Sequence, residues 1–240
     1  MRIKIIKKYA LSAVALILLG GCYGTQPSLV ADNSYTRTKL GSVLGAVTGA
    51  VAGYNSGNHH NKKGAVLGAV AGAVAGGSVG YLLDKQANEI ANALGTGVAN
   101  DPLAAKDPNR TIVVMKYPDH VRVLFRDKMM FATGSSKLQP SARSKVLRLA
   151  SVLRQYPKTV VGVAGFTDNR GGYSYNQKLS LNRASSVARL LSVNGQRPRI
   201  KGCSYNKPLV PNSSAKNMAI NRRVEVYLYN DPSKMTDPCK

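Results

Sequence analysis

The chain has 240 residues, with 34 Lys and Arg against 11 Asp and Glu, and a formal net charge of +23. So large an excess of cations favours polyanionic partners. The chain has no Ser/His/Asp order, no phosphate-binding loop and no His/Cys cluster at metal-ligand spacing, so we predict no enzymatic activity, no metal and no cofactor.

The first 21 residues have the pattern of a secretory signal peptide. Residues 1–8 carry four Lys and Arg and no acid, and residues 10–19 are apolar apart from Ser12, a stretch too short to span a membrane. The run Leu18-Leu19-Gly20-Gly21-Cys22 resembles the lipobox of bacterial lipoproteins. The resemblance implies cleavage before Cys22 and lipidation of its thiol. Since Tyr23 follows in place of Asp, it also implies sorting to the outer membrane. The alternative is an ordinary signal peptide with an unrelated Cys.

After a short tether over 22–39, glycines recur at every fourth residue in two runs, 41–53 and 64–80. On a helix this spacing places the glycines on one face, where two backbones can approach closely. A polar connector, 54–63, separates the runs. We therefore predict a glycine-zipper helical hairpin over 40–83, similar to segments of other envelope lipoproteins. Either membrane insertion or self-association would give such a hairpin the close packing that its glycines need. A flexible Gly/Ala spacer is the alternative.

A linker is predicted over 84–110. Residues 81–94 can continue the second helix, but 95–110 are rich in Gly, Asn, Asp and Pro, which favour irregular structure. Fully extended, these last sixteen residues would reach at most about 55 Å. This length suits a tether between a membrane and the cell wall.

Residues 111–230 have the pattern of an α/β sandwich. Strands are predicted over 111–115, 121–125, 159–164, 199–204 and 224–229, and helices over 141–155, 173–193 and 215–221. We read the order as β-α-β-α-β, then a short helix and a last strand at the edge of the sheet. The helices cover one face, and a tail follows over 231–240. About 120 residues can bury one adequate core.

Three spaced motifs identify a family resemblance. They are Gly165-Phe166-Thr167-Asp168 with Gly171, Asn176 with Leu179-Ser180 and Arg183-Ala184, and Asn221-Arg222-Arg223-Val224-Glu225. Together they resemble the OmpA-like peptidoglycan-binding family. The chain departs from the family pattern in Phe166, where many members carry His or Tyr, and in an extra Gly in the turn. The resemblance implies the same fold, with a ligand site where the strand meets the helix.

The resemblance also implies what the site binds. Asp168 would contact the ammonium, and Arg183 the carboxylate, at the free end of meso-diaminopimelate in a peptidoglycan stem peptide. A guanidinium can hold a carboxylate through two parallel hydrogen bonds, so the chemistry agrees. Asn176 would add a hydrogen bond, Thr167 would assist, and Arg222 would close the pocket or hold a neighbouring carboxylate. As alternatives, Asp168 could stabilise a turn or cap a helix, and Arg183, Arg222 and Arg223 could be solvated charges.

Two cysteines remain beside Cys22. An oxidising compartment would allow a disulfide between Cys203 and Cys239, but the spacing leaves two unpaired thiols equally open.

From these features we predict a lipid-anchored, non-catalytic protein of the outer membrane. Its domain would lie in the periplasm and tether the membrane to peptidoglycan by binding diaminopimelate. The signal peptide argues against nucleic acid as a partner. The alternative function is a structural subunit of an envelope-spanning machine, such as a secretion system, in which residues 40–83 would make the protein contacts.

Overall fold

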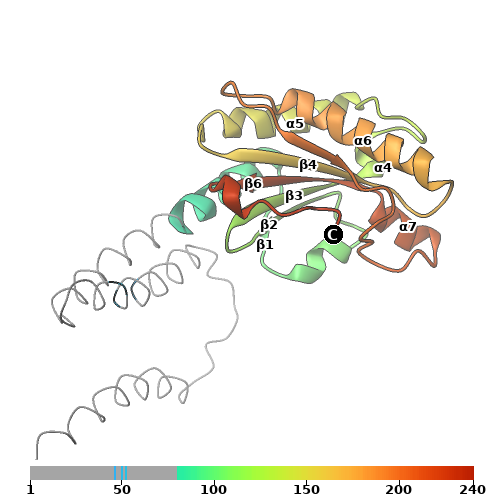
Figure 1. The fold of residues 1–240 in the computed structure, drawn as a ribbon, viewed down its shortest axis with the longest axis horizontal. Coiled ribbons are helices and arrows are strands. Elements are labelled where there is room, and N and C mark those ends of the chain that lie inside the picture. The colour runs from blue at the N-terminus through green and yellow to red at the C-terminus, as the bar shows by residue number, and fades with distance from the viewer. Residues whose placement is uncertain (1–45, 47–49, 51, 53–79) are drawn as a thin grey trace, which may run out of the picture. The chain divides into compact units, whose positions relative to one another are not determined.

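The computed structural model of the chain describes residues 46, 50, 52 and 80–240 (Figure 1). The predictions of a signal peptide over 1–21, of lipidation at Cys22 and of a tether over 22–39 lie outside these residues, as does nearly all of the predicted hairpin over 40–83. Within the described part of the chain, no helix has both the length and the apolar composition that crossing a membrane requires.

A six-stranded mixed sheet forms the centre of the domain. Its strands are β1 (Val98–Ala99), β2 (Ile112–Lys116), β3 (His120–Arg126), β4 (Val160–Phe166), β5 (Arg199–Gly202) and β6 (Arg223–Tyr229). Their order is β1-β2-β3-β6-β4-β5. The β2–β3, β3–β6 and β6–β4 pairs are antiparallel, and β1 and β5 run parallel to their neighbours at the two edges. It follows that β3 and β4 run in the same direction and end at the same edge of the sheet.

The prediction that the last strand lies at an edge is wrong, because β6 is central. Val226 lies opposite Val123 on one side and Val163 on the other. The charged residues of β6 make it resemble a half-exposed strand, but Arg223 and Glu225 are buried and form an ion pair with a 2.7 Å N–O distance. Pairing the charges inside the domain allows a charged strand to take a central position.

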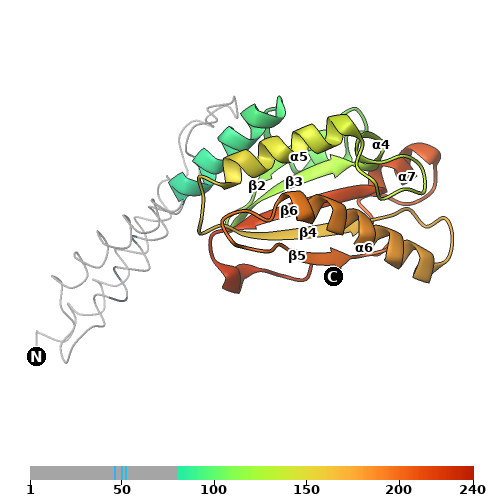
Figure 2. The same ribbon diagram turned by 90° about the horizontal axis from the view of Figure 1, so that it is seen from above.

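Three helical segments cover one face of the sheet, as Figure 2 shows: residues 80–94, α5 (Pro140–Leu153) and α6 (Tyr173–Leu190). The apolar residues of α5 recur at helical spacing and pack against alternate residues of the strands. The resulting core includes Val114, Val123, Val146, Leu149, Leu153, Val163, Val187 and Val226. The predicted α/β sandwich with helices on one face is confirmed.

The segment predicted as a linker, 84–110, is part of the folded domain. Leu83, Ile90 and Leu94 belong to the main core, and β1 adds a strand beside β2. The short helix η2 (Pro102–Lys106) buries two alanines against the other face of the sheet. Gly, Asn, Asp and Pro therefore interrupt regular structure here without preventing packing.

Polar contacts also fix residues 80–94 to the domain. Gln86 donates a hydrogen bond of 2.9 Å to the Thr159 hydroxyl, just before β4. Lys116 forms a buried ion pair with Asp84, at an N–O distance of 3.1 Å. The two contacts join the helix to the end of β2 and to the residue before β4, so the helix has a fixed position on the sheet.

On the face away from the helices, Cys203 and Cys239 form a disulfide with Cα atoms 5.1 Å apart. It holds the tail, which includes η3 (Pro232–Lys234), against the end of β5. Lys201 adds an ion pair of 3.1 Å to Asp237. The predicted tail over 231–240 is thus attached along its length, with α7 (Ala215–Asn221) preceding β6.

Candidate functional site

Two glycines allow α6 to lie directly on the strands. A Cβ atom at Gly165 of β4 would lie 2.1 Å from the Ser180 carbonyl oxygen, and one at Gly202 of β5 would lie 2.7 Å from the Leu181 amide nitrogen. Side chains at either position would push the helix outward. The close approach brings the first turns of α6 beside the ends of β4 and β5.

The turn between β4 and α6 is held by backbone and side-chain contacts. Gly171 adopts a φ of +84°, which glycine tolerates best. Asn176 donates from Nδ2 to the carbonyl oxygens of Arg170 and Gly171, at 2.8 and 3.4 Å. Because its amide nitrogen bonds to these two backbone carbonyls of the turn, Asn176 positions the loop that carries Asp168.

All five residues predicted to bind the ligand line one open pocket of about 780 Å³. They are Thr167, Asp168, Asn176, Arg183 and Arg222, and the same pocket is lined by Asp127, Lys128, Phe131, Arg170 and Tyr175, among others. Asp127 begins the short helix α4 (Asp127–Met130). The start of α6, α4 and α7 lie at one end of the domain, and residues 80–94 begin near the other (Figures 1 and 2).

Arginines connect the two carboxylates of the pocket. Arg222 contacts Asp168 through Nη1 at 2.5 Å and Asp127 through Nε at 3.7 Å. Arg170 adds hydrogen bonds from Nε and Nη2 to Asp168 Oδ2, at 3.1 and 2.9 Å. Its backbone N–H donates to Asp168 Oδ1 at 3.0 Å. Asp168 therefore accepts hydrogen bonds on both oxygens.

Arg183 is held in place on three sides. Its Nη1 pairs with Asp127 Oδ1 at 2.9 Å, and its Nε donates to the Ser135 carbonyl oxygen at 2.9 Å. The guanidinium also lies over the Phe131 ring, 5.2 Å from its centre, a favourable position for a cation. Phe131 thus packs beside the site.

The two carboxyl groups have pKa values shifted in opposite directions. Burial raises the pKa of Asp168, but hydrogen bonds from Arg170 and Arg222 outweigh it, and the net pKa lies below the ordinary value. Burial raises the pKa of Asp127, and the attraction of Arg183 and Arg222 only partly offsets it. Burial also lowers the pKa of Arg183. Asp168 is thus the more acidic of the two carboxyl groups.

A buried hydroxyl next to Asp168 has no hydrogen-bond partner. The Thr167 side chain lines the pocket and is buried, and its Oγ1 makes no hydrogen bond. Its backbone N–H donates to the Ser204 carbonyl oxygen at 2.8 Å, which fixes the residue in position. Buried polar groups are nearly always paired in folded proteins, so this hydroxyl is an unsatisfied polar group beside the pocket.

Within the Asn221–Glu225 motif, only Arg222 lines the pocket. Asn221 accepts hydrogen bonds from the backbone N–H groups of Leu209 and Val210, and so supports the preceding loop. Arg223 is buried, with its guanidinium over the Phe166 ring, 3.7 Å from the ring centre. The alternative that Arg223 is a solvated charge is wrong, because it pairs with Glu225 inside the domain.

Three charged residues of the pocket were not predicted from the sequence: Asp127, Lys128 and Arg170. Asp127 directly follows β3, and a carboxylate just after a strand is a signal that could have drawn attention to it. Arg170 lies in the turn next to Asp168. The sequence shows its charge there, but not the direction in which its side chain points.

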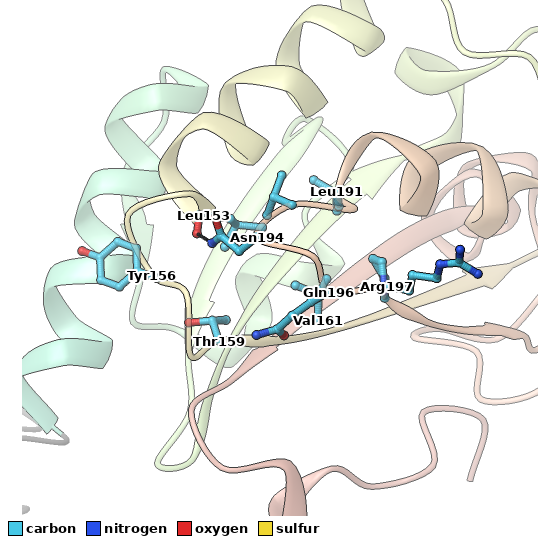
Figure 3. A pocket seen from close by; sticks show the side chains of 10 residues that line it. Leu153, Tyr156, Thr159, Val161, Leu191, Asn194, Gln196 and Arg197 are labelled. Carbon is cyan, nitrogen blue, oxygen red and sulfur yellow. Dashed lines mark hydrogen bonds between the residues drawn. The ribbon is translucent and has the colours of Figure 1, made fainter.

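A second, smaller cavity offers no comparable site. It encloses about 10 Å³ between the turn after α5 and the segment after α6, enough for one water molecule at most. Figure 3 shows Asn194 beside Leu153; its Nδ2 donates to the Leu153 carbonyl oxygen at 3.1 Å and so caps α5. Among the residues that the structure describes, no group of three His, Cys, Asp or Glu could hold a metal ion.

Comparisons with known proteins find family matches for two parts of the chain. Residues 130–222 match the model of the OmpA family, and residues 1–84 match the YMGG-like Gly-zipper model. The chain is 34% identical over 154 residues to the probable lipoprotein YiaD of Escherichia coli, covering 62% of this chain and 64% of that protein. It is 38% identical over 99 residues to outer membrane porin F of Pseudomonas aeruginosa, covering 40% of this chain and 28% of that protein. The chain thus covers less than two thirds of either relative.

Among solved structures, the domain is similar to the cell wall anchor of the T6SS from Pseudomonas aeruginosa. The two are 32% identical, with a TM-score of 0.49, and the match covers 60% of this chain and 99% of the other.

Proposed function

We propose, since residues 130–222 match the model of the OmpA family, that this domain anchors the protein to peptidoglycan by binding the diaminopimelate of a stem peptide. The observation that carries the proposal is the pocket at the start of α6, which a carboxylate and a buried guanidinium line together, with an unpaired hydroxyl on the neighbouring Thr167. A zwitterionic group needs both charges, and the hydroxyl would bond to either end of it.

In this proposal Asp168 receives the ammonium of the ligand. Its lowered pKa keeps it ionised at neutral pH. Arg183 receives the carboxylate, since contacts with Asp127 and Ser135 orient the guanidinium without using all five of its N–H groups. Arg222 contacts both carboxylates and orients them, and Asn176 holds the turn.

The role is one of attachment, without catalysis. The relatives that match the chain carry the names of a lipoprotein and an outer membrane porin, and their similarity supports a place in the cell envelope. We further propose that Cys22 carries a lipid in the outer membrane and that the domain lies in the periplasm. Residues 40–83, which overlap the Gly-zipper match, would pack close to the membrane or against other copies.

Calorimetric titration of the full-length protein in detergent with meso-diaminopimelic acid tests the proposal. We expect saturable binding to the wild type and at least about tenfold weaker binding to Asp168→Asn, which removes one charge without changing size. Thr167→Val should weaken binding by about fivefold, the effect of one lost hydrogen bond.

The matched control is Asp119→Asn, which removes a carboxylate from the turn between β2 and β3, outside the pocket lining. It should bind like the wild type. The proposal fails if the wild type does not bind, or if Asp168→Asn and Asp119→Asn bind equally well while both remain folded by thermal unfolding.

A further inference from the structure

Arg170 occupies the carboxylate that the ligand would use. Its side chain donates two hydrogen bonds to Asp168 Oδ2, the same oxygen that Arg222 contacts. Oδ2 thus accepts three hydrogen bonds, and an ammonium group that bonds to this oxygen takes the place of one of these guanidinium groups. The structure shows which of them is easier to move.

The three arginines of the pocket differ in exposure. The side chain of Arg170 is 66% exposed, that of Arg222 is 24% exposed and that of Arg183 is 4% exposed. An ion pair on an exposed side chain contributes little, so Arg170 can leave Asp168 at small cost. Its backbone N–H bond to Asp168 Oδ1 does not depend on the side chain and would hold the carboxylate in place.

The pocket keeps an excess of positive charge after an ammonium has replaced Arg170 at Asp168. Besides Arg183 and Arg222, Lys128 and Arg170 are cationic, and only Asp127 and Asp168 are anionic. A ligand with one ammonium and one carboxylate leaves this excess unchanged. A second carboxylate would reduce it, and the displaced Arg170 would be the nearest exposed guanidinium able to hold that group.

We propose, resting on the proposed function, that Arg170 is a specificity-determining residue. It covers Asp168 in the free protein and turns to a second carboxylate of the bound stem peptide. The pocket thereby selects peptides that carry a further free carboxylate over those in which that group is amidated. Arg170 competes with the ligand's ammonium for the Asp168 carboxylate, and pairs with the ligand's second carboxylate once it is displaced.

The test compares three tripeptides on the full-length protein in detergent by calorimetric titration. The first is L-alanyl-γ-D-glutamyl-meso-diaminopimelate. The other two carry an amide at the glutamyl α-carboxyl or at the diaminopimelate carboxyl nearest the glutamyl bond. We expect the wild type to bind the free acid about three- to tenfold more tightly than at least one of the amides. Arg170→Gln should bind all three tripeptides alike, because it lacks the guanidinium that distinguishes the free acid from the amides.

Arg154→Gln is the matched control, because it removes an exposed arginine just after α5, outside the pocket lining. It should keep the preference for the free acid. The inference is overturned if the wild type binds the acid and both amides equally, or if Arg170→Gln retains the preference. Loss of all binding in the wild type, or binding unaffected by Asp168→Asn, would instead refute the proposed function itself.

Discussion

Asp127 and Asp168 are held by one side chain, Arg222, although they follow two strands that do not touch. Arg126 at the end of β3 and Phe166 at the end of β4 both lie opposite Arg223, on the two sides of β6. The central strand therefore brings the two carboxylates together, and the residue just before it connects them. The pocket cannot form until β6 has joined the sheet between β3 and β4.

The close contact between α6 and β4 should not tolerate a methyl group. Gly165→Ala would place its Cβ against the Ser180 carbonyl oxygen, which is part of the backbone and cannot rotate away. We expect this variant to lose about 3 kcal/mol or more of unfolding free energy, measured in urea, and to bind ligand more weakly because α6 is displaced.

Gly172→Ala is the control for this substitution. Gly172 has an extended backbone, with φ −70° and ψ 153°, and an added Cβ would meet no atom within 4 Å. Its stability should be unchanged or rise by about 0.4–1 kcal/mol. Equal effects of the two substitutions would contradict the proposed packing of α6.

The helix formed by residues 80–94 should be needed for the stability of the domain. Ile90→Ala removes a fully buried side chain from the main core and should cost about 2–5 kcal/mol. A fragment of residues 105–240 should unfold at a lower temperature and urea concentration than one of residues 80–240. Identical unfolding curves for the two fragments would show that these residues are a linker after all.

Acid should affect the two carboxylates of the pocket in opposite ways. Asp168 has a lowered folded-state pKa, so its contribution to stability is present above its ordinary pKa and is lost as pH falls through the folded value. Asp127 has a raised folded-state pKa, so its contribution is present at low pH and is lost as pH rises through that value.

Urea unfolding between about pH 5 and pH 2 measures this difference. Asp168→Asn should lose less stability on acidification than the wild type, and Asp127→Asn should lose more. The opposite signs make each variant the control for the other. Changes of the same sign in both would mean that the pKa values are not shifted as described.

The disulfide should stabilise the domain. Cys239→Ser opens a loop whose ends are 36 residues apart and should lower the unfolding free energy by about 2–4 kcal/mol. A reducing agent should produce a similar loss in the wild type and no further loss in the variant. If the reductant has no effect on the wild type, the two thiols are unpaired in solution.

The helices and strands, and the site residues Asp168, Asn176 and Arg183, could be predicted because the sequence patterns that indicate them lie within short segments. Asp168 and Arg183 lie on one turn and one helix, and helical spacing was enough to place Asn176 and Arg183 on a shared face. Helix α6 begins at Tyr173 as expected, since the glycines before it interrupt the preceding strand and the apolar pattern follows.

The rest depends on contacts between distant segments. Asp127 joins the site only because β6 lies between β3 and β4, and the motif containing Arg223 and Glu225 suggested an exposed edge instead. Residues 84–110 looked like a linker because their composition favours loops, but Ala99, Ala104 and Ala105 are small enough to pack closely on the sheet. Composition cannot show such packing.

The position of Thr159 has a mechanical consequence. Gln86 bonds to it at the start of β4, and Asp168 follows the end of the same strand, so β4 connects the helix through which the chain enters to the proposed ligand carboxylate. In the proposed tether, tension between the membrane and the wall would reach this strand through the bond to Thr159. It would then load the hydrogen bonds to β6 and β5 in shear, all at once, and these pairs would resist it better than if they were peeled apart one at a time.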